Sequence, residues 1–547
     1  MRKEHMVLSA LWFGNDRPKM ETFFKPFVGE CNKLSQDGFL WTHGIIEPRS
    51  VLSKVYPIIC CADAQARCML QNMVQFNGYF GCGFCKHKGE YDNDSNSLKY
   101  PYCIPHAPLR TNAGTKSDSI EAEETGMRVN GLKGVSILSF LFHFNIVAGF
   151  IPDYMHAVCL GTVRRFFFMW IDPTNADKPY YLGQRLQLLC DRISQIKPTK
   201  EIQRVPRPLD VIKYWKASEW RSFLFYSLPI LSGVLPPMYL AHWAMLVQSM
   251  FHLCSTNISH HSLRMSEFLI GKFLIFVEPL YGKKEMTYNI HILSHMPDCV
   301  RNWGPLWCTS SFMFESYNGY LKNLFNDTRA VPQQIFTNLC RLQFLHRHYV
   351  KAVSPTVEDF IQRVLFHKKV TKSANYFQLP HFEIVTLGTP EDLKLTAALR
   401  LALQDVIGER IISVTAKCYK RFIIDNVLFS TTEYSSKFKR TDSLIEFNDH
   451  VAEILYLIIF KNHNCRRTNC ECEEHVLLVL RELLTVQRLK CIYGGLNSEI
   501  GCSVSFIRQV RNGRIYSTYP HNQFNKAMDI LYEGKRFVVT LPNRLEE

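Results

Sequence analysis

The sequence predicts a fold of the α/β plus α class, in which a large helical insertion interrupts an α/β core and a β-rich or mixed module follows. Three observations predict it. The apolar run VYPIICC at 55–61 indicates a buried strand of a sheet. Long apolar segments within 134–290 have the length of helices. After about residue 366, short apolar runs alternate with turn residues, as in strands.

The composition is that of a folded, basic protein. The chain has 547 residues, of which 47% are hydrophobic and 21% charged, which indicates a globular protein large enough for several domains. Its 64 Lys and Arg against 49 Asp and Glu give a formal net charge of +15. This excess favours a polyanionic partner, most commonly nucleic acid, although a basic surface can also serve solubility alone.

Cysteine usage and the N-terminal residues predict an intracellular protein, nuclear or cytoplasmic. The 19 cysteines are scattered and no apolar signal segment opens the chain, so most thiols are expected to be reduced. The longest apolar run, 137–151, is interrupted by His143 and Asn145 and is too short to span a bilayer. We therefore expect no membrane segment.

The first predicted elements lead to a candidate catalytic residue, Asp63. Residues 6–13 are short and apolar, as in a strand, and 19–34 have the spacing of an amphipathic helix. Asp63 follows the predicted strand at 55–61, and open α/β sheets place catalytic groups beyond the carboxyl ends of their strands. The alternative is that Asp63 only caps the helix after it.

A Cys-x-x-Cys knuckle follows in GCGFC. Cys82 and Cys85 have the spacing with which two thiolates bind one tetrahedral zinc. The knuckle supplies only two ligands, and no second cysteine pair is nearby. Either these thiols are redox-active or bystanders, or the other ligands come from distant sequence, with His87 as a local alternative.

The middle of the chain changes from polar to apolar. Residues 90–133 indicate a surface insertion or linker, and helices dominate 134–290. His156 lies in this region and either is a satisfied core histidine or faces a site. The predicted helices include 137–149, 155–170, 219–231 and 238–254.

Two histidines and a glutamate follow the helical region. His291 and His295 fall on one helical face, where they can share a metal. With Cys82 and Cys85 they make a complete structural zinc set of two imidazoles and two thiolates. Glu315 either lies on the wet side of an amphipathic helix or belongs to a site, because the residues before it are apolar and turn-forming.

The C-terminal part has no assignable role. Its patterns predict strands at 376–387 and 411–429, a helix within 390–406, and short apolar strands over 451–541. A dense cluster in KNHNCRRTNCECEEH offers a second zinc site, although its spacing is irregular. Its members are His463, Cys465, Cys470, Cys472 and His475.

Five stretches, in one order over roughly residues 7–365, together resemble the CACTA-like DDE transposases of animal genomes. They are LWFGNDRPKMETFFKPFV, CADAQARCMLQNMVQFNGYFGCGFC, GFIPDYMHAVCLG, WKASEWRSFLFYSLPILSGVL and YNIHILSHMPDCVRNWGPLWCTSSFMFESYNGYLK. The layout is also similar to the core of the recombination-activating recombinase of antigen-receptor genes. There, a Cys-x-x-Cys pair follows the second aspartate and a histidine pair precedes the glutamate.

The resemblance implies an incomplete RNase H-like core interrupted by a helical insertion. Together with the composition of the chain, it predicts a partial core at 1–89, a surface linker or insertion at 90–133, a helical insertion domain at 134–290 and the zinc-histidine and glutamate helices at 291–366. The composition alone predicts the C-terminal module at 367–547.

The resemblance also implies roles for the candidate residues. Asp63 matches the second catalytic aspartate and Glu315 the catalytic glutamate. The residues that match structural zinc ligands are Cys82, Cys85, His291 and His295. In such enzymes, carboxylates hold two Mg²⁺ ions that activate water or a 3′-hydroxyl for attack on a phosphodiester. The implied partner is DNA, and enzymes of this kind usually pair two DNA ends as homodimers.

The first catalytic aspartate of the family has no match, because it lies upstream of the segment that resembles 11–28, where this chain begins. We therefore expect a truncated transposase relic, or an incompletely annotated chain, that lacks activity by itself. Its ancestral activity is DNA cleavage and strand transfer by the two-metal DDE mechanism. The alternative is a host-recruited, non-catalytic module that binds DNA or protein.

Overall fold

The computed structural model describes residues 6–43, 49–348, 354, 357, 374–378, 383–462, 474–495 and 498–543. The chain divides into two compact units, each made of two segments. The first unit is Met1–Met169 with His252–His348, and the second is Trp170–Phe251 with Tyr349–Glu547. The fold is mixed α/β with a β-rich C-terminal part, as predicted, but an RNase H-like core is not confirmed. The boundaries of the five predicted domains stay predictions.

The first unit opens with the amphipathic helix that the sequence predicted, α1 (Met20–Gln36). Its buried side chains pack on the segment around Phe144 and Phe150. The prediction of a helix at 137–149 is wrong, because only a short 3₁₀ turn, η2 (Ile137–Phe140), forms there. The Asn145 side chain accepts hydrogen bonds from the N–H groups of Val147 and Ala148, and this local turn competes with helix.

The strands of the first unit are short. β1 (Phe39–His43) pairs antiparallel with β2 (Arg49–Ser53), and β3 (Cys60–Cys61) pairs parallel with β6 (Phe150–Ile151). The predicted buried strand at 55–61 is therefore wrong except for its last two residues, and no strand forms at 6–13. Ile58 and Ile59 are 42% and 37% exposed because, in the described part of the chain, β3 has a partner strand on one edge only.

The predicted linker at 90–133 is ordered and partly buried. It forms the hairpin of β4 (Glu90–Asp92) and β5 (Ser97–Lys99) and the helix α3 (Asn112–Thr125). Its Tyr100 and Arg110 are buried. The other helices that the site uses are α2 (Ala64–Leu70), η3 (Met155–Val163), α8 (His260–Tyr281), α9 (Tyr288–Ile292), η8 (Leu293–His295), α10 (Met296–Trp303), α11 (Phe312–Lys322) and α12 (Val331–His348).

The helices of the second unit are apolar on all sides. α6 (Ala217–Leu231) and α7 (Pro237–Leu253) confirm the predicted helices at 219–231 and 238–254, and their side chains are almost all buried. Such helices need cover on every face. One cover is the sheet of the same unit, where Phe251 stacks on Phe506 with ring centroids 4.0 Å apart.

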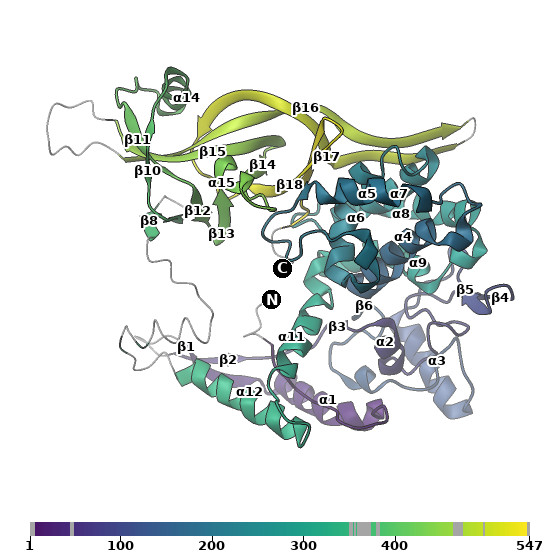
Figure 1. Cartoon of the computed structure of the whole chain (residues 1–547). Helices are drawn as coiled ribbons and strands as arrows, with labels where there is room; N and C mark the ends of the chain where they lie inside the picture. The colour runs from purple at the N-terminus through teal and green to yellow at the C-terminus, as the bar shows by residue number, and fades with distance from the viewer. Residues whose placement is uncertain are drawn as a thin grey trace. The chain divides into compact units, whose positions relative to one another are not determined.

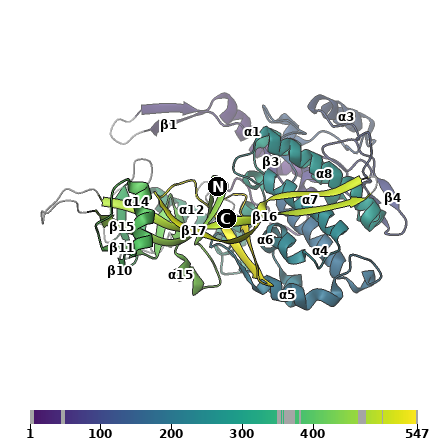
Figure 2. The ribbon, with the colours of Figure 1, turned by 90° about the horizontal axis from the view of Figure 1, so that it is seen from above.

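The main sheet of the second unit is antiparallel and nine-stranded. Its order is β10 (Glu391–Lys394), β11 (Thr415–Tyr419), β15 (His450–Lys461), β14 (Leu444–Phe447), β18 (Asn525–Tyr532), β19 (Lys535–Thr540), β17 (Ser498–Thr518) and β16 (Glu474–Gly495), with β7 (Ile196–Lys197) beside β18. β16 also pairs with β15, so six of these strands close on themselves. Figures 1 and 2 show β16 and β17 running side by side as one long ribbon.

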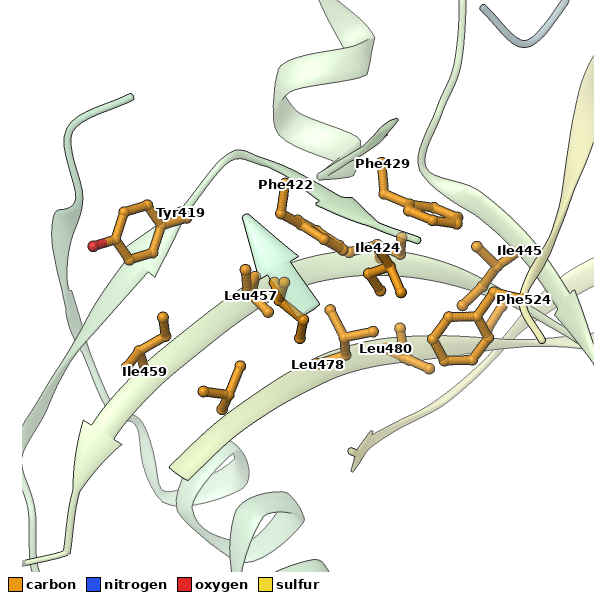
Figure 3. Packing of buried hydrophobic residues seen from close by; sticks show 14 residues of the cluster. Tyr419, Phe422, Ile424, Phe429, Ile445, Leu457, Ile459, Leu478, Leu480 and Phe524 are labelled. Carbon is orange, nitrogen blue, oxygen red and sulfur yellow. The ribbon is translucent and has the colours of Figure 1, made fainter. Parts of the chain in front are cut away.

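Both faces of the β15–β16 pair are buried, which explains their continuous apolar sequences. On one face, Leu457 and Leu478 pack with Phe422 and Phe429 of a second sheet (Figure 3). On the other face, the helix α14 (Ala397–Ile407) covers the alternate residues. The second sheet contains β8 (Ala374–Gln378), β9 (Glu383–Leu387), β12 (Arg421–Ile424) and β13 (Val427–Ser430).

None of the helices in the described ranges is both long and apolar enough to cross a membrane. The predicted second zinc cluster lies outside the described residues, except for His475, which is in β16.

Candidate metal centre

The Cys82–Cys85 knuckle is a tight loop between α2 and β4. Its glycines allow close packing: a Cβ at Gly83 would lie 2.5 Å from Oε1 of Gln71. The N–H of Phe84 donates a hydrogen bond of 3.5 Å to the sulfur of Cys82. The loop therefore presents both sulfur atoms inward, and both cysteines are buried.

Arg110 fixes this loop from the segment that the sequence predicted to be a surface linker. Its Nε donates to the carbonyl oxygens of Cys82 and Cys85 at 2.8 and 3.2 Å. A second guanidinium nitrogen donates to the carbonyls of Phe80 and Asn130. Sequence reasoning missed this residue, because it acts through backbone carbonyls and leaves no spacing signal.

The histidine ligands lie on α9 and the 3₁₀ turn η8 that continues it. The imidazole of His291 stacks on Tyr100, and that of His295 stacks on Phe84, with centroids 4.9 and 5.3 Å apart. These aromatic contacts fix the planes of both rings, so that each points a nitrogen toward the knuckle.

The four predicted ligands come together. Nε2 of His295 lies 3.6 Å from the sulfur of Cys82, and Nε2 of His291 lies 3.3 Å from that of Cys85. All four ligand atoms lie within 4.8 Å of one another. Tetrahedral zinc with bonds of about 2.0–2.3 Å places its ligand atoms roughly 3.3–3.8 Å apart. The residues present therefore fit a tetrahedral metal ion such as zinc.

His87 is not a fifth candidate. Its Nδ1 accepts a hydrogen bond from the N–H of Gly89, so its Nε2 carries the proton and donates to the carbonyl of Pro101. Both ring nitrogens are thus used by the backbone, which excludes the local alternative that the sequence left open.

The pKa shifts of Cys82, Cys85 and His291 also suit the binding of a cation. Burial alone would raise the pKa of Cys82, but the hydrogen bond from the Cys85 thiol and the nearby His295 and His291 hold this pKa well below its usual value. The same hydrogen bond, with burial, raises the pKa of Cys85. Burial lowers the pKa of His291, which keeps the imidazole neutral, the form that binds metals. The two sulfurs thus share one proton that a metal ion can replace.

Arg67 connects the centre to the short parallel strands. It is fully buried on α2, and its guanidinium lies over the rings of Phe84 and Tyr288 at 5.2 and 5.9 Å. It also donates to the hydroxyl of Tyr288 and to the carbonyl of Ile151 at the end of β6. The knuckle, the histidine helix and the end of β6 are therefore held by one cation.

One side of the centre opens into a cavity of about 250 Å³. Three of the four ligands line it, together with Gly271 of α8 and Tyr102. Glu267 and Asp298 also line it, and Arg301 bridges these two carboxylates.

The carboxyl ends of β3 and β6 carry Asp63 and Asp153. Because the two strands are parallel, these ends meet at one edge. Asp63 caps α2 through a hydrogen bond of 2.7 Å from the N–H of Ala66, so the capping interpretation is confirmed. Capping uses one carboxylate oxygen of Asp63 and is compatible with a second role for this residue.

Asp153 lies at the same edge and is buried. Its buried carboxylate accepts from the N–H groups of Met155 and His156, as a helix cap. It also bonds Nδ1 of His156 and accepts from the N–H of Ser311 at 2.9 Å, just before the helix that carries Glu315. Burial would raise its pKa, but the hydrogen bonds from His156 and Ser311 lower it.

The pKa of His156 responds to both predicted catalytic carboxylates. The hydrogen bond to Asp153 raises the pKa of His156 against the effect of burial, and the charges of Asp153, Asp63 and Glu315 raise it further. Asp63 and Glu315, far apart in the sequence, thus act on one imidazole. Glu315 is exposed on the first turn of α11. Among the described residues, only the Cys/His set groups three or more metal ligands, so the predicted Mg²⁺ site has no support.

No protein-family model and no curated protein sequence matches this chain. A function for this chain must therefore be inferred from the geometry of the site and from the resemblance of its sequence motifs.

Proposed function

We propose that this protein is a transposase-derived DNA-binding protein whose first unit keeps the framework of a DDE strand-transfer site. The observation that carries the proposal is the assembly of Cys82, Cys85, His291 and His295, which come from two distant parts of the sequence, into one set of metal ligands. The net charge of +15 supports a polyanionic partner.

In this proposal the metal centre has a structural role. Zn²⁺ held by Cys82, Cys85, His291 and His295 joins the loop after α2 to the chain after α8. Closed sites with four protein ligands stabilise folding and do not bind substrate. The hydrogen bond from Ser311 to Asp153 then fixes the start of α11, and with it Glu315, at the edge that carries Asp63.

Asp63 and Glu315 are the residues that would hold Mg²⁺, which supplies Lewis-acid stabilisation of a phosphodiester under attack. His156, with its raised pKa, is positioned to donate a hydrogen bond to a phosphate oxygen at the same edge. A two-metal site usually uses three acidic ligands, and Asp153 is already bonded to His156 and Ser311. We therefore expect binding of DNA without cleavage by this chain alone.

A second candidate function, a host-recruited non-catalytic module, is favoured by one observation. The described residues contain no acidic group of three metal ligands. Such a module would bind DNA or protein. Only a module that binds protein would not need the basic charge, so the affinity for DNA separates that form of the second candidate from the first.

The test combines binding and cleavage on one zinc-loaded preparation. We expect the unmodified chain to bind duplex DNA with an affinity that falls steeply as salt rises from about 50 to 200 mM. With Mg²⁺ or Mn²⁺ we expect no nicking. Failure to bind DNA at low salt would contradict the proposal and favour a protein partner. Nicking that is lost in both Asp63→Asn and Glu315→Gln would instead show that the chain retains the enzymatic activity.

A further inference from the structure

Two cysteines of the second unit face each other across β16 and β17. In the antiparallel register, Cys491 is directly opposite Cys502. Opposite residues in such a pair have Cα atoms about 4.5 or 5.5 Å apart, and a disulfide needs about 4.4–6.8 Å. Neither cysteine is in a disulfide or belongs to the metal centre, and the thiol of Cys502 donates a hydrogen bond of 3.5 Å to the carbonyl oxygen of Ala244.

The two strands approach closely at this position. Gly501, next to Cys502, has a φ of +110°, and a Cβ there would lie 1.9 Å from the carbonyl oxygen of Cys491. Only glycine allows this approach. Burial, and then the charge of Cys491, raises the pKa of Cys502 to about 12.

The two cysteines lie just beyond a register shift in the pairing of β16 with β17. The pairing of β16 with β17 shifts register after Arg481 and again after Thr485, and its third and largest shift leads from Arg488 opposite Arg508 to Lys490 opposite Ser503. The skipped residues of β17 lead into the segment from Ile507 that pairs with β19. The Cys491–Cys502 pair is the second rung of the short distal ladder that restarts after this jump.

We propose that Cys491 and Cys502 form a reversible cross-strand disulfide when the chain meets a low-molecular-weight disulfide oxidant. This bond would lock the register of the distal ladder. In the reducing compartment that the composition predicts, the dithiol is the resting state and the disulfide forms only under oxidation.

The exchange balances in two steps. Cys502, the more exposed of the two, loses a proton, and its thiolate attacks one sulfur of the oxidant RSSR, which forms a mixed disulfide and releases RS⁻. Cys491 then loses a proton, and its thiolate attacks the sulfur of Cys502 and releases a second RS⁻. The two released thiolates take up the two protons. Two protein thiols are oxidised and one RSSR is reduced to two RSH.

Peptide mass analysis tests the proposal on the full, zinc-loaded chain. After incubation with oxidised glutathione, the protein is denatured, its free thiols are alkylated, and it is cut with trypsin. Cleavage after Lys490 and Arg508 releases one peptide, 491–508, that contains both cysteines, no other cysteine and no internal cleavage site. We expect most of this peptide to be unalkylated and two hydrogens lighter, and to regain two alkyl groups after reduction.

Two controls keep the result specific. Cys418 is buried on β11 opposite Glu391 and Ile458, so it should remain a thiol during oxidation and be fully alkylated afterwards. In Cys491→Ser, Cys502 should instead carry glutathione, because the second step is impossible. Full alkylation of peptide 491–508 in the oxidised wild type, or two separate glutathione adducts on it, would overturn the proposal.

Discussion

His291 and His87 provide a matched test of metal ligation at the scale of single residues. Their rings lie 5.2 Å apart, but only His291 has a nitrogen beside a cysteine sulfur. We expect His291→Gln to lose about one zinc per chain, and His87→Gln to keep it. Metal analysis after dialysis measures this, with Cys82→Ser as a second ligand variant. Equal zinc in His291→Gln and the wild type would contradict a Cys₂His₂ site.

The pKa of His156 tests whether Asp63 and Glu315 share its surroundings. Each of these carboxylates favours the imidazolium, so Asp63→Asn and Glu315→Gln should each lower the pKa of His156. Histidine NMR titration measures it, and the spectrum of His156→Gln assigns the signal. Asp298→Asn, which removes a carboxylate beside the metal centre, is the control and should leave this pKa unchanged.

The pair of His156 and Asp153 also predicts a window of pH for stability. Because the folded-state pKa of His156 is raised, its stabilisation is complete below its unfolded pKa and is lost as pH rises through the folded one. The pKa of Asp153 is lowered, so its contribution is lost as pH falls through that value. Urea unfolding midpoints of wild type and His156→Gln should differ most near the unperturbed histidine pKa of about 6.5 and converge as the pH rises beyond the raised pKa of the folded state. A difference that grows with alkaline pH would exclude the ion pair.

At the scale of helices and strands, the sequence predicted the elements best where the apolar or ligand residues repeat with helical spacing. The amphipathic spacing of 19–34 predicts α1, and the His291–His295 spacing predicts one ligand face, although the helix tightens to a 3₁₀ turn there. The run at 55–61 misled because its apolar residues have no second neighbouring strand in the described part of the chain. An apolar run is taken to indicate a buried strand, but whether the run is buried depends on the elements that pack around it.

The helix α8 forms one wall of the cavity beside the metal centre, and this predicts the kinetics of metal release. Gly271 faces the cavity, where an added Cβ would meet only the hydroxyl of Tyr102, at 3.5 Å. Gly271→Leu should therefore fill the cavity and slow removal of zinc by a coloured chelator severalfold, with no change in zinc content. Gly29→Leu in α1, where a Cβ meets nothing, is the matched control. Equal rates in both variants would show that metal leaves by another path.

At the scale of the whole molecule, the β-rich C-terminal part and the four metal ligands were predictable, because strands and ligand pairs have local signals. Arg110 and the bond between Asp153 and Ser311 were not, because both depend on backbone groups that tertiary structure brings near. The closed pairing of β15 with β16 was equally hidden, since each strand shows only its own apolar run. The sequence thus predicts the metal ligands better than it predicts the hydrogen bonds that position them.

The division into two units predicts that metal loss has a localised effect. All four ligands lie in the first unit, whereas the closed sheet and its cores lie in the second. Because ligand binding to the folded state stabilises the part that binds, chelation should accelerate amide hydrogen exchange in α2, α9 and the knuckle by tenfold or more, roughly. Exchange in β14, β15 and β18 should stay unchanged. Mass spectrometry of peptides from both units measures this, with His87→Gln treated in parallel. Uniform acceleration would mean that the chain unfolds as one cooperative body, and no acceleration in α9 would mean that the metal contributes nothing to folding.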